Sequence, residues 1–408
     1  MMRSFTTGCA TARFEPALQA IGLPLKKYVS MMNTDHRVQG LDNDAVVADW
    51  PAISGTELAW LRGHYPALDG ECRVLWHSPR PFSAAALVAC GSRRCFVKRH
   101  HVSVRTAGVL TEEHRFIAHL AAAGLPVVQV LHAHNGATAI AHGDWTYEVH
   151  AEGDGHDLYR DSPSWTPLDD VAQARTAGAM LARLHAAAAS YHAPQRSTHL
   201  LVARDDLIRA HDPVALLERE LPDRPALAGY LSRQRWEHDL QRAVLPWHAA
   251  VVERLAAEPV LWGHNDWHVS NLLWHGHGAT ATIGTVFDFG LASPTSALFD
   301  LATAIERNAI AWLDAGGEGP VAHADIALAL LAGYRQVRPL AAAQVHLLAD
   351  LLPVVHLDFA LSEVEYFQGV TGSPANADVA YHTFLLGHAE WFASRPGRAL
   401  LDALHAAA

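Results

Sequence analysis

The residues with the clearest chemical potential lie between positions 264 and 290. An aspartate and an asparagine are held in the segment His264-Asn265-Asp266-Trp267-His268-Val269-Ser270-Asn271, and Phe287-Asp288-Phe289-Gly290 follows. Phosphoryl transfer needs a carboxylate that orients the attacking hydroxyl and oxygen ligands that hold Mg²⁺ on the nucleotide phosphates. We therefore predict that Asp266 is the catalytic base and that Asn271 and Asp288 are Mg²⁺ ligands.

The pattern around these residues predicts a hairpin that positions them. An apolar stretch begins at Asn271, a His-Gly-His-Gly turn follows, and residues 281–287 alternate as a strand does. The returning strand would deliver Asp288 beside Asn271. Two metal ligands at the ends of paired strands are better placed than two ligands in a long loop.

A cation for the phosphates is available in the first half of the chain. Residues 94–98 predict a strand that places Phe96 and Lys98 on one face, so the ammonium group should be buried and need a partner. Glu113 lies in the apolar stripe of the next predicted helix, and we predict a Lys98–Glu113 ion pair. Glu112 is the alternative partner.

The wider pattern predicts an α+β protein with two lobes. A capping box formed by Ser54 and Glu57 should open a first helix. A small, mostly antiparallel sheet with one inserted helix is expected next, and a larger, mainly helical lobe follows it. The predicted strands are 72–76, 85–89, 94–98, 127–131, 138–141 and 145–150, and the main predicted helices are 171–190, 298–313, 323–337 and 340–367.

Composition limits the classes of partner. Half of the residues are hydrophobic, 18% are charged, and the net charge is −11. This balance argues against a nucleic-acid footprint. The sequence shows no stretch apolar enough to cross a membrane and no apolar signal core, so we expect a cytoplasmic protein. The oligomeric state is not predicted.

Four cysteines are too few for a disulfide framework in a chain of 408 residues, which favours a reducing compartment. Cys90 and Cys95 flank a predicted turn and could face each other across a hairpin. We favour the interpretation that they are unbonded strand residues.

Taken together, the motifs resemble the aminoglycoside phosphotransferase and choline/homoserine kinase-like group, which shares a bilobal protein-kinase-like fold. The similarity covers residues from about 70 to about 310. It includes Phe96-Val97-Lys98, the helix from Glu113 to Leu120, Met180 to His185, and Asp300-Leu301-Ala302. The stretch from Lys98 to Asp157 is similar to the branch that contains bacterial stress-response kinases.

The resemblance implies ATP and Mg²⁺ as cofactors. Lys98 would contact the α- and β-phosphates, and backbone groups of Glu148, Val149 and His150 would bind adenine. The loop that should cover the phosphates contains no glycine, so Ser78, Ser83 or Arg80 would have to replace its backbone contacts. We expect a poorly ordered tail at 1–45, a nucleotide-binding lobe at 46–150 and a helical lobe at 151–408.

For the acceptor side, Asp358, Ser362 and Glu365 repeat at helical spacing and are candidate contacts, although we favour the interpretation that they form a solvated helix face. His268 is a further candidate contact. Because the chain has 28 histidines, the cluster formed by residues 264, 268, 275 and 277 is not interpreted as a zinc site.

The favoured function is transfer of the ATP γ-phosphate to a hydroxyl of a small molecule, such as an aminoglycoside, an amino alcohol or a homoserine-like compound. The alternatives are a bacterial stress-type protein Ser/Thr kinase and a non-catalytic nucleotide-binding protein of the same fold. A binding protein would not need Asp266, and only a short segment separates Gly290 from Asp300, which leaves little room for peptide docking.

Overall fold

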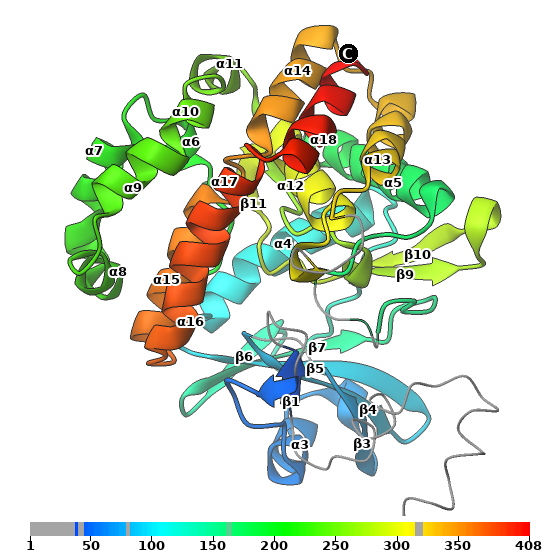
Figure 1. Cartoon of the computed structure of the whole chain (residues 1–408). Helices are drawn as coiled ribbons and strands as arrows, with labels where there is room; N and C mark the ends of the chain where they lie inside the picture. Colours follow the sequence, from blue (N-terminus) through cyan, green and yellow to red (C-terminus); the bar gives the residue numbers. More distant parts are fainter. Residues whose placement is uncertain (1–36, 40–44, 79–81, 161, 163–164, 315–320) are drawn as a thin grey trace, which may run out of the picture.

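The computed structural model describes residues 37–39, 45–78, 82–160, 162, 165–314 and 321–408. A five-stranded sheet with its helices forms one lobe and a larger, mainly helical part forms the other (Figure 1). This arrangement confirms the predicted α+β, bilobal fold.

The sheet of the small lobe is antiparallel throughout, and its strands lie in the order β3-β4-β5-β7-β6. Helix α3 (Gly55–Arg62) begins at the predicted capping box, in which the Ser54 hydroxyl accepts a hydrogen bond from the Glu57 backbone and the Glu57 carboxylate accepts one from the Ser54 backbone. Helix α4 (Ala107–Ala122) is inserted between β5 and β6. The strands are β3 (Cys72–His77), β4 (Ala84–Cys90), β5 (Arg93–His101), β6 (Ala139–His142) and β7 (Trp145–Ala151).

Three predictions for this lobe need correction. Residues 127–131 do not form a strand, because only isolated bridges join Val127 to Val286 and Val130 to His150. Part of the predicted tail, β1 (Arg37–Gln39), pairs with β2 (Ala45–Val47), while residues 1–36 and 40–44 lie outside the described part of the chain.

The third correction concerns the cysteines. Cys72 and Cys90 are opposite each other on β3 and β4 and form a disulfide, whereas Cys95 is free and buried. In the sequence, Cys95 was the residue expected to face Cys90 across the turn. The actual partner is the residue opposite it on the preceding strand, which spacing along the chain does not reveal.

The helical lobe is built around a large apolar core. Two short antiparallel strand pairs, β8 with β11 and β9 with β10, belong to this lobe. The strands are β8 (Val260–Gly263), β9 (Leu272–His275), β10 (Thr282–Val286) and β11 (Ser293–Ser296).

The principal helices begin and end close to the predicted positions, although the segment predicted as one helix at 340–367 is divided into two. They are α5 (Val171–Ala188), α12 (Ala297–Ala309), α13 (Ala324–Val337), α14 (Ala342–Leu351) and α15 (Leu357–Gly369). The shorter ones are α6 (Asp206–Arg209), α7 (Pro213–Glu220), α8 (Pro225–Leu231), α9 (Trp236–Ala243), α10 (Leu245–His248), α11 (Val252–Ala256), α16 (Pro374–Asp378), α17 (His388–Trp391) and α18 (Arg395–His405). A π-helical segment, Val379–Gly387, joins α16 to α17.

Helices α5 and α13 pack against each other at unusually close range. A Cβ atom added to Gly178 would lie 2.0 Å from the Leu330 carbonyl oxygen, and one added to Gly333 would lie 1.9 Å from the Arg175 carbonyl oxygen. Neither distance is compatible with a side chain, so the two glycines set the separation of the helices.

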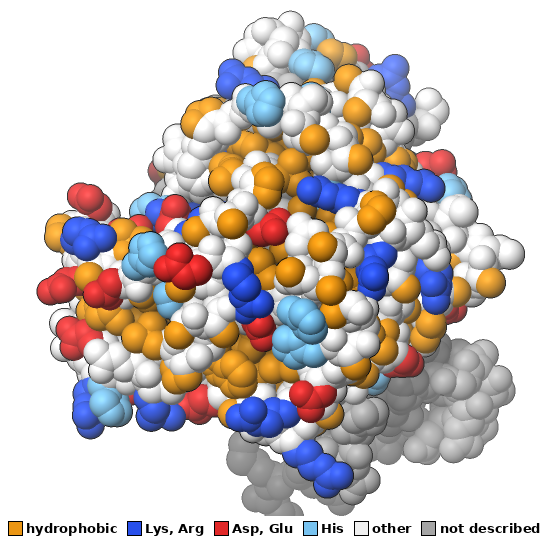
Figure 2. Space-filling model, turned by 90° about the horizontal axis from the view of Figure 1, so that it is seen from above, with side chains coloured by type: hydrophobic (Ala, Val, Ile, Leu, Met, Phe, Trp, Pro, Cys, Tyr) orange, Lys and Arg blue, Asp and Glu red, His pale blue; other side chains and the backbone are white. Residues whose placement is uncertain are grey.

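Acidic, basic and histidine side chains are interspersed on the face of the helical lobe seen in Figure 2. That distribution gives no single-sign surface on this face for a polyanion to follow. Among the described residues, no helix combines the length and the apolar character needed to span a bilayer.

We expect Gly333→Ala to lower the free energy of unfolding by about 1–3 kcal/mol, because the added methyl group forces α5 and α13 apart. Thermal or denaturant unfolding would measure the change. Gly229→Ala in α8 is the matched control, since nothing lies within 4 Å of its added Cβ. The control should be neutral or slightly stabilising. Equal destabilisation by both variants would contradict this interpretation of the helix contact.

Candidate active site

One buried carboxylate fixes the backbone of the catalytic loop. Asp300, in the first turn of α12, accepts hydrogen bonds from the backbone nitrogens of His264 (2.7 Å) and Asn265 (2.8 Å). His185 of α5 donates a third from Nε2 at 3.0 Å, and its Nδ1 accepts one from the Tyr334 hydroxyl of α13 at 2.9 Å. The closely packed α5–α13 pair therefore holds the loop through Asp300.

The loop is also held from the opposite side. His264 donates from Nε2 to the carbonyl oxygen of Phe287 at 3.0 Å, which ties the loop to the residue before Asp288. Asn265 has a φ of 59°, a left-handed conformation that asparagine tolerates better than most residues. Its amide nitrogen donates to the Ser293 carbonyl oxygen at 3.0 Å. The structure thus gives His264 and Asn265 positions that support the loop.

Asp266, the predicted base, is held by a partner on each carboxylate oxygen. Arg307 Nη1 lies 2.6 Å from Oδ1, and the Asn271 side-chain nitrogen donates to Oδ2 at 3.1 Å. Burial raises the pKa of Asp266 above the ordinary value, and the neighbouring Arg307 opposes that shift. No sequence motif marks Arg307. The only available signal is its position two helical turns after Asp300, which places it on the same side of α12.

The two predicted metal ligands are brought together by the β9–β10 hairpin. Leu272 and Val286 are opposite each other in its register, and the Phe287 backbone nitrogen donates to the Asn271 carbonyl oxygen at 3.1 Å. The Asn271 side-chain nitrogen is used by Asp266, which leaves its side-chain oxygen as the ligand atom. Oxygen atoms from Asn271 and Asp288 suit a hard cation such as Mg²⁺, which would neutralise phosphate charge.

Lys98 reaches across the cleft to Asp288. Its Nζ lies 2.9 Å from Asp288 Oδ1 and 3.9 Å from Glu148 Oε1. Burial alone would raise the pKa of Asp288, but the Lys98 ammonium group more than offsets this and leaves the pKa below its ordinary value. Asp288 is therefore an anion, which suits a carboxylate for binding a divalent cation.

The predicted Lys98–Glu113 ion pair is wrong. Glu113 instead accepts a hydrogen bond from Arg196 at 3.2 Å, and the alternative partner Glu112 accepts one from the Ser197 backbone nitrogen. Two facts were invisible in the sequence. Glu148 lies directly opposite Lys98 in the β5–β7 register, and Arg196 comes from a segment that matches no motif.

A cavity of about 650 Å³ lies between the two lobes. This volume falls in the range of pockets that hold small ligands. It is lined from the small lobe by Ser78, Ser83, Ala85, Leu87, Phe96, Lys98 and His150, and from the large lobe by Asn271, Leu273, Phe287 and Asp288, among others. Phe96 and Lys98 share a face, as predicted. Ser78 and Ser83 lie at the predicted phosphate loop, whereas Arg80 lies outside the described residues.

That loop is anchored to the large lobe. The Phe82 ring packs edge-on against Tyr366 of α15, with ring centroids 5.2 Å apart, and also lies 6.0 Å from Phe367. Phe82 itself adopts a φ of 73°, a conformation that costs energy for a bulky residue. These ring contacts therefore hold Phe82 in a strained conformation next to Ser83, which lines the cavity.

The segment that connects the lobes begins slightly later than predicted. Glu148 and Val149 are inside the β5–β7 ladder, and the Val149 carbonyl oxygen accepts a hydrogen bond from Leu131. Neither lines the cavity, whereas His150 does, together with residues 151–157. Gly155 has a φ of +109° and lies against β9, so the connection requires glycine there.

The three candidate acceptor residues lie on α15 and are all buried, so they do not form the solvated face that the sequence favoured. Ser362 accepts a hydrogen bond from the Leu201 backbone, Glu365 pairs with His199 and Arg224, and Asp358 accepts one from the Leu207 backbone. All three contacts point towards the segment around α6–α8. His268 caps a 3₁₀ turn and contacts the Thr166 carbonyl oxygen.

Glu363, on α15, is the acidic residue that faces the catalytic side. It is 8% exposed, and no hydrogen bond or ion pair to its carboxylate is found among the described residues. Burial raises its pKa to about 8; Arg307 opposes this shift, and Asp266 and Glu306 reinforce it. Helical spacing alone could not distinguish Glu363 from its acidic neighbours.

Fold and site together define a kinase-like phosphotransferase architecture. A sequence model described as the phosphotransferase enzyme family (APH) matches residues 82–340, which is more than half of the chain. The chain therefore belongs to the phosphotransferase enzyme family. No curated protein sequence matches it significantly.

Several solved structures share the fold of this chain. A microcompartment-associated aminopropanol kinase aligns with a TM-score of 0.55 and 19% identity, over 85% of this chain and 99% of its own. The amicoumacin kinase hAmiN, in complex with AMP-PNP, Ca²⁺ and Ami, aligns with a TM-score of 0.54 and 14% identity, over 85% of this chain and 92% of its own. A Plasmodium vivax ethanolamine kinase aligns with 0.52 and 12%, over 81% and 83%.

We expect Asp300→Asn to destabilise the protein by about 1–3 kcal/mol, because an amide cannot accept all three hydrogen bonds and leaves a buried donor unpaired. Transfer activity should also fall, since the loop that carries Asp266 loses its anchor. Thermal unfolding and initial rates would measure both effects. Asp325→Asn, an exposed residue in the first turn of α13, is the matched control and should change neither.

Proposed function

We propose that this protein transfers the γ-phosphate of Mg·ATP to a hydroxyl group of a small, amine-bearing molecule. The observation that carries the proposal is a cavity between the lobes that is lined by Lys98, Asn271 and Asp288, with Asp266 hydrogen-bonded to Asn271. These four groups supply the base, the metal ligands and the phosphate cation that the reaction needs.

In this proposal the acceptor hydroxyl approaches Asp266, which removes its proton as the oxygen attacks the γ-phosphorus; the bond from that phosphorus to the β–γ bridging oxygen breaks, and ADP leaves. Arg307 and Asn271 hold the carboxylate in one orientation, so the base is prepositioned before the acceptor arrives. Lys98 would contact the phosphates. Asn271 and Asp288 would hold Mg²⁺, which supplies charge neutralisation on the phosphates.

The charge beside Asp266 favours a cationic acceptor. Glu363 and Glu306 are buried near Arg307, and with Asp266 they make three carboxylates against one guanidinium group. A buried carboxylate with no partner is costly, and an acceptor ammonium group would relieve that cost at Glu363. The aminopropanol and ethanolamine kinases among the structural neighbours are named for amine-bearing alcohols.

The protein-kinase alternative receives less support. After Gly290 the chain enters β11 at Ser293, which is paired with β8, and α12 begins at Ala297. Little chain is therefore available for a segment that could dock a peptide. A non-catalytic nucleotide-binding protein would leave the ordered Asp266–Arg307 arrangement without a purpose.

The test is a phosphate-transfer screen with Mg·ATP and four acceptor classes, namely aminoglycosides, amino alcohols, homoserine and a generic protein. We expect transfer to at least one amine-bearing small molecule. Asp266→Asn should lower kcat by about 10²–10⁴-fold, the range for loss of a general base, while nucleotide still binds. Asp325→Asn again serves as the matched control. Nucleotide binding without transfer to any acceptor would favour the binding protein, and transfer to protein alone would favour the protein kinase.

A second test addresses the acceptor ammonium group. We expect Glu363→Gln to raise the KM for the amine acceptor about tenfold or more with little change in the KM for ATP, because only the acceptor contact loses its charge. Glu365→Gln, on the same helix but paired with Arg224, is the matched control and should leave the acceptor KM unchanged. The reverse pattern would mean that the sequence-based choice of helix face was correct after all.

The pH dependence of Glu363 gives an acceptor-free measurement. Its pKa in the folded protein, about 8, exceeds the ordinary value of 4.5, so the folded state binds the proton more tightly. The stabilisation is present below pH 4.5 and is lost as pH rises towards 8. Glu363→Gln should therefore gain stability relative to the wild type between pH 5 and pH 8.

In the wild type, the acceptor KM should fall over the same interval as Glu363 ionises.

A further inference from the structure

A buried carboxylate surrounded by histidines lies behind Lys98. Glu148 is 1% exposed, and His114 and His150 donate to its Oε2 at 2.7 and 2.9 Å. His100 donates to Oε1 at 2.9 Å, and Lys98 Nζ lies 3.9 Å from the same oxygen. The three imidazoles come from β5, α4 and β7, so the cluster joins the helix of the small lobe to its sheet.

This cluster has the residue types of a metal site, because ligand atoms of His114, Glu148 and His150 lie within 4.8 Å of one another. Two features argue against a metal ion. The Lys98 ammonium group already lies beside the same carboxylate, and a divalent cation would repel it. Histidine ligands usually orient themselves through their second nitrogen, whereas His114 Nδ1 is buried without a partner in the described structure. Hydrogen bonding accounts for the arrangement.

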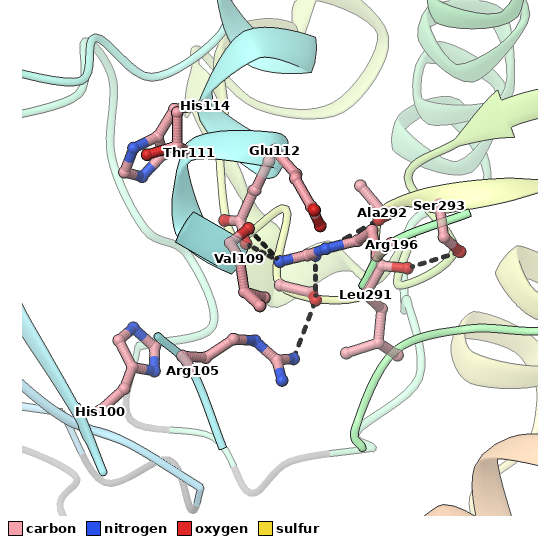
Figure 3. A network of polar contacts seen from close by, with 12 residues as sticks. His100, Arg105, Val109, Thr111, Glu112, His114, Arg196, Leu291, Ala292 and Ser293 are labelled. Carbon is pink, nitrogen blue, oxygen red and sulfur yellow. Dashed lines mark hydrogen bonds and ion pairs between the residues drawn. The ribbon is translucent and has the colours of Figure 1, made fainter. Parts of the chain in front are cut away.

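The neighbouring residue of α4 is engaged elsewhere. Figure 3 shows Arg196 lying between α4 and the segment Leu291–Ser293. Arg196 donates to Glu113 at 3.2 Å, to the Val109 carbonyl oxygen at 3.1 Å and to the Gly290 carbonyl oxygen at 2.9 Å. Arg105 also donates to Gly290, at 3.1 Å. Glu113 is thus tied, through Arg196, to the backbone that follows the metal-binding Asp288.

We infer that Glu148 is the positioning residue for Lys98, held in place by His100, His114 and His150, and that Glu113 positions the loop after Asp288 through Arg196. A residue of strand β7 therefore positions the lysine, and a residue of helix α4 positions the loop. The inference rests on the proposed function, because it assigns Lys98 to the nucleotide phosphates.

The division becomes important once Mg·ATP binds. Without ligand, Lys98 forms an ion pair with Asp288. When Asp288 acts as a metal ligand, its carboxylate would no longer be sufficient to hold the Lys98 ammonium group. Glu148 is the remaining carboxylate in ion-pair contact with Lys98 in the described structure. Because three histidines fix its orientation, it defines one position from which the ammonium group can reach a phosphate.

The test is a pair of double-mutant cycles read by kcat/KM for ATP and by the Kd of Mg·ATP. Glu148→Gln should lower kcat/KM for ATP at least tenfold without changing the acceptor KM, and this loss should disappear in a Lys98→Met background. Glu113→Gln is the matched control, and its effect should persist in that background because it acts through Arg196. Glu148→Asp, which keeps the charge on a shorter side chain, should recover part of the loss, and it carries the same cycle if Glu148→Gln does not fold.

Multiplicative losses for Glu148→Gln and Lys98→Met would overturn the inference, since they would show a merely structural role. Coupling of Lys98 to Glu113 instead would overturn it as well. One transition-metal ion per purified wild-type chain, absent from Glu148→Gln, would replace it with a metal site. Calorimetric Kd values do not require an acceptor, so failure of the proposed transfer reaction would be recognised separately.

Discussion

The active site depends on one interaction, the acceptance of three hydrogen bonds by the buried carboxylate of Asp300. A buried anion is costly unless its oxygens are fully paired, and here the pairing is possible only when the catalytic loop, α5 and α12 hold one relative position. The glycine contacts between α5 and α13 extend the same constraint, because Tyr334 on α13 orients His185. The packing of helices in the large lobe therefore fixes the backbone of the loop that carries Asp266.

A second constraint joins the lobes across the cavity. The hairpin that follows the catalytic loop presents Asp288, and Lys98 meets it from the sheet. Asp266, Asn271 and Asp288 belong to one continuous piece of the large lobe, whereas Lys98 belongs to the other lobe. When the lobes are correctly aligned, the Lys98 ammonium group therefore meets the Asp288 carboxylate. Bound nucleotide and metal would share these two groups.

The sequence was sufficient for the parts in which local pattern and chemistry coincide. The capping box at Ser54, the β9–β10 hairpin and the bilobal α+β fold are confirmed because each depends on residues close in sequence or on strong periodicity. Predictions failed where the partner was distant. The expected Lys98–Glu113 pair, the unbonded state expected for Cys90 and the solvated face expected on α15 were contradicted by contacts with elements whose packing leaves no trace in spacing, such as the segment of Arg196.

The contact between Phe82 and α15 bears on the entropy of ligand binding. A glycine-rich loop samples many conformations and must give them up when it closes over phosphates. This chain instead fastens its loop to Tyr366, on the same helix that carries Glu363. Fixing Phe82 removes conformations that this end of the loop would otherwise sample, so part of the ordering cost is met during folding.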